Sequence, residues 1–262
     1  MVKTFENTGY WAIILGGSSG LGLASAKKLA QEGMNIIIVY RNGRAEMEAI
    51  EKEFEAIRQA NVQFEAFNAD ALNPEKREEL ISTIKLTIGN NKIRCLLHSV
   101  AKGSLKAMTG ENALSTEDLN ITMNAMAFSF YDWAKALLNA ELFADDARLL
   151  AFTSEGSSKA WPSYGAVSAA KAALEALMRS MALEFAPDGL RSNCIMAGIT
   201  DTQSLRMIPG SEALANHAKE RNPFQRMTTP DDVADAVYML CLDEAAWING
   251  AVIPVNGGEH LQ

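Results

Sequence analysis

The chain has 262 residues, of which 48% are hydrophobic and 21% charged, enough for one large α/β domain or two small ones. A net charge of -8 argues against a surface that binds nucleic acid or anionic lipid. The three cysteines are widely spaced in apolar runs, which argues against a disulfide framework or a metal cluster. We therefore expect no bound metal. No signal-peptide core and no apolar stretch of membrane-spanning length is present, so we expect a cytoplasmic protein.

Seven short apolar runs alternate with segments of helical periodicity. The runs predict strands at 11–15, 36–40, 62–67, 93–97, 149–152, 190–195 and 251–255. Between them, apolar residues recur every three or four positions, as at Met47, Ile50, Phe54 and Ile57. This alternation predicts an α/β fold with a Rossmann-type, doubly wound parallel sheet of about seven strands and helices on both faces. No linker or internal repeat divides the chain, so we expect a single domain over 1–262.

Local signals mark the ends of several elements. Three predicted helices begin with a capping side chain or a proline in the first turn: Asn73-Pro74, Ser115 with Asp118, and Thr229-Pro230 with Asp232. Pro254 lies inside the last predicted strand and cannot donate to a ladder, so we expect that strand at a sheet edge. The helix after Tyr164 is apolar on most faces, which is compatible with a contact between copies of the chain; the residues are Leu174, Leu177, Met178, Met181, Leu183 and Phe185.

A glycine-rich turn, Gly16-Gly17-Ser18-Ser19-Gly20-Leu21-Gly22, follows the first predicted strand and opens a helix. Gly16 would permit the tight turn, Gly20 would let the backbone approach a pyrophosphate, and Gly22 would allow close helix packing. The alternative is a tight connection without a ligand. Because the turn follows the first strand of an alternating α/β pattern, nucleotide binding is the better interpretation.

The second strand ends at Tyr40-Arg41, where folds that prefer NAD present a carboxylate to the ribose. Arg41 could pair with a 2′-phosphate, which favours NADPH over NADH, or it could be a solvated arginine beside Arg44. Asp70, after the third strand, could accept from the adenine amino group while the Ala71 amide donates. It could equally cap its own turn.

Tyr164 and Lys171 stand seven residues apart in one predicted helix. A seven-residue step leaves both side chains on one face, about 10 Å apart along the axis, whereas a four-residue step would separate them by about 6 Å. Taken alone, the two residues could be a packing tyrosine and a solvated lysine.

These motifs together resemble the short-chain dehydrogenase/reductase family over nearly the whole chain. The resemblance rests on the glycine turn, Asn124, Ser154, Tyr164, Lys171 and the terminal Val255-Asn256-Gly257-Gly258. The common form of that family carries Tyr-x-x-x-Lys, but the residue four before Lys171 is Val167, which has no proton to donate. Tyr-x6-Lys is instead similar to the enoyl-acyl-carrier-protein reductase branch, and so is the run His98-Ser99-Val100-Ala101 after the fourth strand. Many enoyl reductases carry a second tyrosine at the position of Ser154. A serine there, together with Val167 and Arg41, most resembles the NADPH-dependent type III enzymes.

The resemblance implies roles for the site residues. Hydride would pass from the nicotinamide to the β-carbon of an enoyl thioester, and Tyr164 would stabilise the charge on the thioester oxygen. Lys171 would bind the nicotinamide ribose, Ser154 would assist the oxygen or only order its loop, and Asn124 would support the lysine through water or be a satisfied buried amide. The implied cofactor contacts are Gly16, Ser18, Ser19, Gly20, Leu21, Gly22, Arg41, Asp70, Ala71, Ser99, Val100, Lys171, Ile199 and Thr202.

The sequence therefore predicts an NADPH-dependent enoyl-acyl-carrier-protein reductase of fatty-acid synthesis, assembled as a homotetramer or homodimer. Its substrate would be an acyl thioester on acyl carrier protein. We expect the segment at about 203–220 to form a lid over the acyl chain. The nearest alternative is a carbonyl or 3-oxoacyl reductase that uses Tyr164 and Ser154. A further alternative is a protein that senses a dinucleotide without catalysing a reaction. His98, His217 and His260 have no expected role in catalysis or metal binding.

Overall fold

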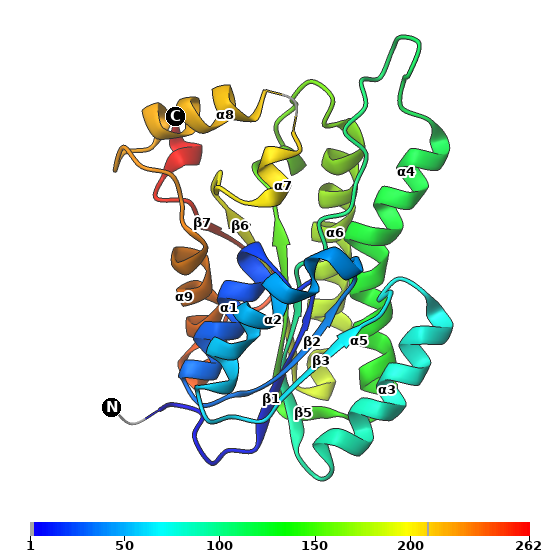
Figure 1. Cartoon of the computed structure of the whole chain (residues 1–262), viewed down its shortest axis with the longest axis vertical. Helices are drawn as coiled ribbons and strands as arrows, with labels where there is room; N and C mark the ends of the chain where they lie inside the picture. Colours follow the sequence, from blue (N-terminus) through cyan, green and yellow to red (C-terminus); the bar gives the residue numbers. More distant parts are fainter. Residues whose placement is uncertain (1–2, 209) are drawn as a thin grey trace.

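Seven parallel strands form one sheet in the order β3-β2-β1-β4-β5-β6-β7 in the computed structural model, which describes residues 3–208 and 210–262 (Figure 1). The predicted doubly wound sheet is confirmed. The strands are β1 (Tyr10–Leu15), β2 (Asn35–Tyr40), β3 (Phe64–Asn68), β4 (Lys92–His98), β5 (Phe143–Thr153), β6 (Leu190–Ala197) and β7 (Val252–Val255). The order reverses between β1 and β4, and at such a switch point the carboxyl ends of the strands leave a crevice for a ligand.

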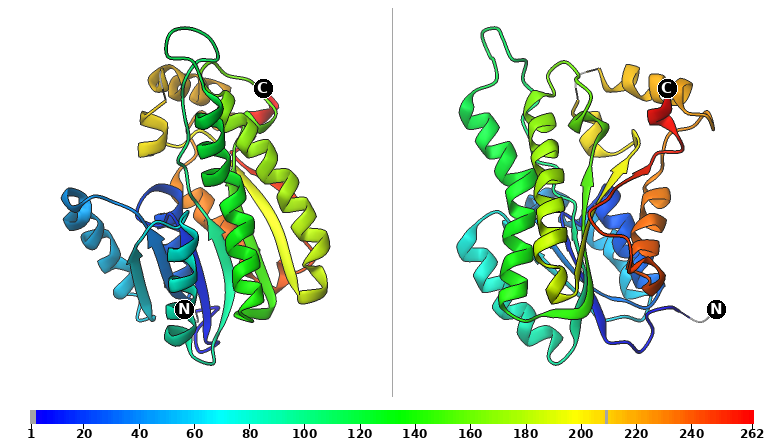
Figure 2. Two further views of the ribbon diagram at one scale, coloured as in Figure 1. Left: turned by 90° about the vertical axis from the view of Figure 1, so that its right-hand side faces the viewer. Right: turned by 180° about the vertical axis from the view of Figure 1, so that it is seen from behind.

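Helices cover both faces of the sheet, as the side view in Figure 2 shows. One layer holds α1 (Gly20–Gln31), α2 (Met47–Arg58) and α9 (Pro230–Cys241). The other holds α3 (Pro74–Ile88), α4 (Thr116–Met123), α5 (Ser129–Asn139) and α6 (Gly165–Glu184). Two further helices, α7 (Gln203–Arg206) and α8 (Ser211–Arg221), lie beyond the carboxyl ends of the strands. Short helical turns occupy 44–46, 155–157, 186–188, 243–245 and 259–261, and a π-helical turn, Asn124–Phe128, joins α4 to α5.

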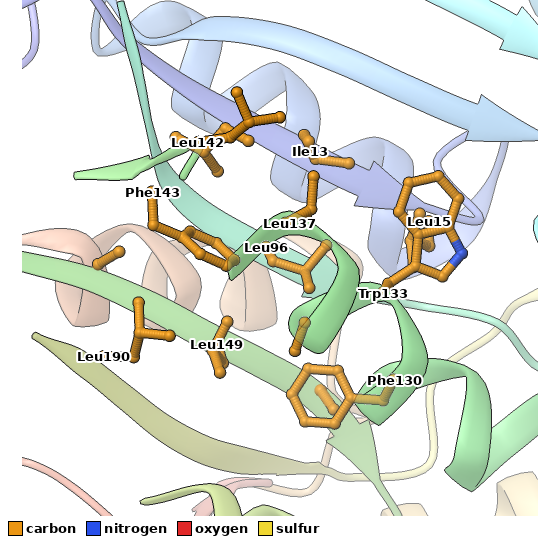
Figure 3. Close-up of a cluster of buried hydrophobic side chains, with 14 of the residues drawn as sticks. Ile13, Leu15, Leu96, Phe130, Trp133, Leu137, Leu142, Phe143, Leu149 and Leu190 are labelled. Atoms are coloured by element: carbon orange, nitrogen blue, oxygen red, sulfur yellow. The ribbon is translucent and has the colours of Figure 1, made fainter. Parts of the chain in front are cut away.

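The alternation of side chains along each strand builds two apolar cores. Ile13 and Leu15 of β1 point to the core shared with α3, α5 and α6, whereas Ala12 and Ile14 point to the core shared with α1, α2 and α9. Figure 3 shows strand residues of the first core packed against Phe130, Trp133 and Leu137 of α5. Because both faces are buried, the strands carry continuous apolar runs, and these are what made the sheet predictable.

The predicted helix starts are confirmed by cap hydrogen bonds. Asn73 accepts from the Lys76 amide at 3.0 Å, with Pro74 in the first turn of α3. Ser115 with Asp118 and Thr229 with Asp232 each form a reciprocal capping box at α4 and α9. A cap of this kind is worth about 1 kcal/mol, so these residues fix where each helix begins.

The largest difference from the predicted strands lies in β5. The structure begins β5 at Phe143, six residues before the predicted start at 149. Asp145, Asp146 and Arg148 interrupt the apolar run there. Arg148 is nonetheless buried, because its guanidinium donates to the carbonyls of Leu240 and Leu242 at 2.8 and 3.0 Å. The Asp146 carboxylate, two residues away in the same strand, pairs with the guanidinium and compensates its charge, while the distant carbonyls satisfy its other N–H groups.

Two other expectations have clear outcomes. Pro254 does lie in the edge strand β7. On α6, Leu174, Met178 and Met181 are buried against the sheet, while Leu183 is 78% exposed. Among the described residues, no helix has both the length and the hydrophobicity needed to cross a membrane.

Candidate active site

A cleft of about 1400 Å³ lies at the carboxyl ends of the strands and extends beneath α7 and α8. It gathers nearly all of the predicted site residues onto one surface. The predicted residues that line it are Gly16, Ser18, Ser19, Gly20, Leu21, Arg41, Asp70, Ala71, Ser99, Val100, Ser154, Tyr164, Lys171, Ile199 and Thr202. Gly22 and Asn124 lie outside its wall.

The glycine turn forms a cradle at the end of β1. Gly16 has φ +84°, and a Cβ there would stand 2.6 Å from the Ser99 carbonyl oxygen, so only glycine fits. A Cβ on Gly22 would stand 2.4 Å from the Gly16 oxygen, which explains a glycine that touches no cleft. The first turn of α1 carries no acidic side chain, and its residues Gly20 and Leu21, whose amides have no acceptor within the helix, line the cleft with Ser19. This end of the cleft suits an anion such as a pyrophosphate.

Arg41 and Asp70 face each other at the outer end of the cleft. The Arg41 guanidinium contacts the Asp70 carboxylate at 2.5 Å and remains 64% exposed. The other Asp70 oxygen accepts from the Leu72 amide at 3.0 Å, so Asp70 does cap its own turn. The predicted alternative in which Asp70 caps its own turn is thus present in the structure. The second Asp70 oxygen pairs with Arg41, the residue predicted to bind a 2′-phosphate.

Two residues that support this end were not anticipated. Asn42 accepts from the Ser18 hydroxyl at 2.8 Å and so links the glycine turn to the segment after β2. Trp133 of α5 is fully buried, and its indole N–H donates to the Ala71 carbonyl at 2.8 Å. Neither contact has a local sequence signal, since the partners are 24 and 62 residues apart.

Tyr164 and Lys171 lie at the inner end of the cleft. Tyr164 is the N-cap residue of α6, and Lys171 lies on the second turn of that helix. Lys171 is only 7% exposed, and its ammonium donates to the Phe152 carbonyl at 2.8 Å. Burial lowers the pKa of Lys171 to about 8. Burial raises the pKa of Tyr164, opposed by the nearby Ser154 hydroxyl, so the phenol keeps its proton at neutral pH.

The Tyr164 ring is held between two neighbours. A Cβ on Gly156 would stand 2.6 Å from Tyr164 Cε1, so the ring packs directly on the glycine backbone. Trp161 meets the ring edge-on at 5.5 Å between centroids. The Gly156 amide also donates to Ser154 Oγ at 3.1 Å, which fixes the Ser154 hydroxyl beside the Tyr164 phenol.

Val167 occupies the position four residues before Lys171. It is buried in a small apolar cluster with Met126 and Ala170, against which Tyr164 also packs. The side chain lines the cleft but offers no proton. The Tyr164 phenol therefore lies about one turn further from the lysine than a side chain at the four-residue position would.

Asn124 does not reach the cleft. It begins the π-helical turn between α4 and α5, and its side chain is exposed. His98, at the end of β4, is 1% exposed and contacts Ser129 Oγ through Nε2 at 2.7 Å. Burial, and then the charge of Lys171, lower the pKa of His98 to about 3, so it is a neutral core residue. This agrees with the expectation that His98 is not a general base.

Apolar side chains from α7, from α8 and from the segment between them line the cleft together with Tyr164: Leu205, Met207, Ile208 and Leu214. Pro209, part of the predicted lid, is outside the described residues. His217 also lines the cleft, although the sequence had marked it as isolated. Its spacing from Ala213 and Leu214 on one helix could have placed it there. No cluster of His, Cys, Asp or Glu suited to a metal occurs in the part of the chain that the structure describes.

Comparisons with known proteins agree with this geometry. A family profile described as "Enoyl-(Acyl carrier protein) reductase" matches residues 16–260. The chain is 28% identical over 251 residues to 1-cyclohexenylcarbonyl-CoA reductase of Streptomyces collinus, covering 94% of this chain and 85% of that protein. It is 28% identical over 256 residues to the enoyl-acyl-carrier-protein reductase (NADH) FabI of Escherichia coli K12, covering 94% and 92%. The solved structure of FabI from Candidatus Liberibacter asiaticus superposes with a TM-score of 0.86 over 100% of this chain and 98% of that one, at 21% identity, which shows the shared fold.

Proposed function

The chain belongs to the enoyl-acyl-carrier-protein reductase family of the short-chain dehydrogenases/reductases, and on this basis we propose that it reduces the α,β double bond of an enoyl thioester with NADPH. As a member it is an oxidoreductase of a family that depends on nicotinamide dinucleotides. One observation carries the proposal: the cleft presents Tyr164 seven residues before Lys171 and an inert Val167 at the four-residue position.

The residues of the cleft fit a dinucleotide. The glycine cradle and the free amides of α1 suit the pyrophosphate, and Lys171 at the inner end suits the ribose hydroxyls. A nicotinamide dinucleotide bound there would supply the hydride. Ser99, Val100, Ile199 and Thr202 line the stretch between these two ends and are the proposed contacts of the nicotinamide half.

Tyr164 has the role of stabilising the substrate oxygen. Hydride addition at the β-carbon moves negative charge to the thioester oxygen, and a positioned O–H donor lowers the barrier most where that charge develops. The raised pKa of Tyr164 keeps the phenol protonated for this donation. Ser154, whose oxygen already accepts from the Gly156 amide, donates its own proton to the same oxygen. Lys171 keeps the surroundings positive while its charge is retained.

Arg41 supports NADPH over NADH. Its guanidinium is exposed at the outer end of the cleft and is held over the adenosine side by Asp70. A 2′-phosphate bound there would take over part of this pairing, because guanidinium binds phosphate in a forked geometry. Asp70 then keeps the arginine oriented. The E. coli relative is named for NADH, so this preference distinguishes the chain from that protein.

The proposed substrate is an acyl thioester on acyl carrier protein. The E. coli relative is named for acyl carrier protein and the S. collinus relative for a coenzyme A thioester. Leu205, Met207, Ile208 and Leu214 give the segment 203–220 an apolar inner side suited to an acyl chain, and we assign it as the lid of one catalytic domain over 1–262. The three buried free cysteines fit the proposed cytoplasmic location, and the family match supports the proposed place in fatty-acid synthesis.

A homotetramer or homodimer is the proposed assembly. The outer face of α6 is lined by small residues, Ala169, Ala172 and Ala176, with Leu183 exposed at its end. Phe128 is exposed beside the neighbouring α4. Small side chains at these positions allow helices of two copies to approach closely. Light scattering on the purified protein tests it, and a monomer at micromolar concentration would contradict it.

A carbonyl reductase is the second candidate, because Ser154 and Tyr164 line the same end of the cleft and could both bind a ketone oxygen. The decisive experiment mixes the enzyme with NADPH and either a crotonyl or an acetoacetyl thioester. Turnover of the crotonyl thioester supports the enoyl reductase, and turnover of the acetoacetyl thioester alone supports the carbonyl reductase. A non-catalytic dinucleotide sensor would bind NADPH without oxidising it.

A further inference from the structure

Arg221, the last residue of α8, joins two carboxylates that are far from it in the sequence. Its Nη2 donates to Glu155 Oε2 at 2.6 Å and to Glu259 Oε1 at 2.9 Å. All three side chains are nearly buried, with exposed fractions of 11% for Arg221, 11% for Glu155 and 3% for Glu259. Such a three-residue cluster is unlike the exposed ion pairs elsewhere on the surface.

Both carboxylates belong to the wall of the catalytic cleft. Glu155 follows Ser154 directly and lines the cleft with it. Glu259 lines the cleft too, and its second oxygen accepts from the Ile199 amide at 3.2 Å. One guanidinium therefore connects the end of the lid to the segment that carries Ser154 and to the segment that carries Ile199.

The charges of this cluster depend on one another. Burial would raise the pKa of Glu155, but hydrogen bonds from Lys159 and Arg221 outweigh it and hold that pKa below its usual value. Removing one member of a buried charge cluster leaves a charge without compensation, whereas such clusters add little stability over apolar replacements. A buried cluster at a cleft is thus better explained by the geometry it fixes than by the stability it adds.

We propose that Arg221 is a positioning residue: it holds the C-terminal end of the lid against the cleft and fixes Ser154 and Ile199 relative to Tyr164. The effect on turnover rests on the proposed function, while the effect on the lid does not. Because both carboxylates bond to the same nitrogen, a lysine at 221 can still bridge them.

The test compares Arg221→Met, Arg221→Lys and, as a matched control, Arg226→Met. Arg226 forms an exposed ion pair with Asp232 and lies outside the cleft wall. We expect Arg221→Met to lower kcat for the enoyl thioester about 100-fold, as a displacement of about 1 Å at a site can do, with a smaller change in the KM of the thioester. Arg221→Lys should recover most of this loss, and Arg226→Met should behave as the parent enzyme.

Limited trypsin digestion gives a readout that needs no substrate. Arg206 and Lys219 are exposed tryptic sites in α7 and α8. With the lid end released, cleavage after these residues should accelerate roughly tenfold in Arg221→Met, because local opening sets the rate, while cleavage in α2 stays unchanged. NADPH affinity, measured by fluorescence, should weaken in the same variant through the Ile199 segment.

If Arg221→Met fails to fold, the variant Glu155→Gln/Arg221→Met/Glu259→Gln removes all three charges together and should fold while keeping the low kcat and the fast lid cleavage. Lid cleavage and NADPH affinity in Arg221→Met equal to those in Arg226→Met would overturn the proposal, and so would lid opening without any loss of turnover. If the parent enzyme reduces neither thioester, the proposed function fails, but cleavage and NADPH affinity still decide the role of Arg221.

Discussion

Tyr164 stands at the N-terminal end of α6 and Lys171 two turns further along it, and both side chains line one cleft. Between them, Val167 fills the four-residue position with an apolar side chain packed against Met126. The donor on this helix is thus displaced along the axis by about one turn, or roughly 5 Å, from the place that a four-residue spacing would give it. In an enoyl thioester the oxygen that gains charge lies three bonds from the carbon that accepts hydride, whereas a ketone oxygen lies one bond from that carbon. The displaced donor therefore suits the thioester oxygen.

Tyr164→Phe tests the donor. Removing one preorganised donor to a developing oxyanion typically costs a factor of about 100 to 1000 in kcat, and we expect a loss of that size. NADPH affinity should change little, since Lys171 and the glycine turn remain. Initial rates and fluorescence titration give the two quantities. A variant with the parent kcat would show that Tyr164 is not the donor.

Gly156→Ala tests how the ring is held. The new methyl group would stand 2.6 Å from Tyr164 Cε1, so the ring or the loop must shift. We expect kcat to fall roughly tenfold to a hundredfold with NADPH affinity unchanged, because the donor is misplaced rather than removed. Ser158→Ala, an exposed position in the same loop, is the control and should keep the parent kcat. Equal rates in the two variants would be incompatible with this role of Gly156.

Arg41→Ala tests the cofactor preference. A charge-assisted hydrogen bond to a phosphate contributes about 1.5–3 kcal/mol, so kcat/KM for NADPH should fall by roughly tenfold to a hundredfold. The value for NADH should change little, because NADH lacks the phosphate. Arg44→Ala is the matched control, since Arg44 does not line the cleft. A parallel loss with both cofactors would refute the phosphate assignment.

The pH dependence tests Lys171. Its pKa is lowered by burial to about 8, and the lysine binds and stabilises only while charged. We therefore expect kcat/KM for NADPH to be full below this pH and to fall as the pH rises through about 8, since this ratio reports ionisations of the free enzyme. In Lys171→Arg the guanidinium stays charged, and the alkaline limb should move to much higher pH. A profile identical in the two proteins would assign the limb to another group.

The sheet could be predicted from local patterns, and most of the residues proposed for the site line one cleft. The apolar runs predicted the strands because the inner strands are buried on both faces, and the caps at Asn73, Ser115 and Thr229 are local hydrogen bonds. The start of β5 was not predictable, since Arg148 is buried there through its ion pair with Asp146 and through hydrogen bonds to carbonyls more than 90 residues away.

The parts of the site that were missed depend on contacts between distant segments. The bond from Trp133 to Ala71 and the pairing of Arg221 with Glu155 and Glu259 exist only once the layers are assembled. The position of Asn124 outside the cleft wall has a different cause. Asn124 begins a π-helical turn, whose extra residue changes the rotation of the side chains from that of an α-helix. A sequence pattern based on 3.6 residues per turn cannot show this change.

The most direct test of the central claim is the rate of NADPH oxidation with crotonyl-acyl carrier protein and with acetoacetyl-acyl carrier protein, measured side by side on the same enzyme. The position of Tyr164 and the inert Val167 predict rapid oxidation with the crotonyl substrate and little with the acetoacetyl one. Oxidation with the acetoacetyl substrate alone would contradict the assignment of this site to enoyl reduction.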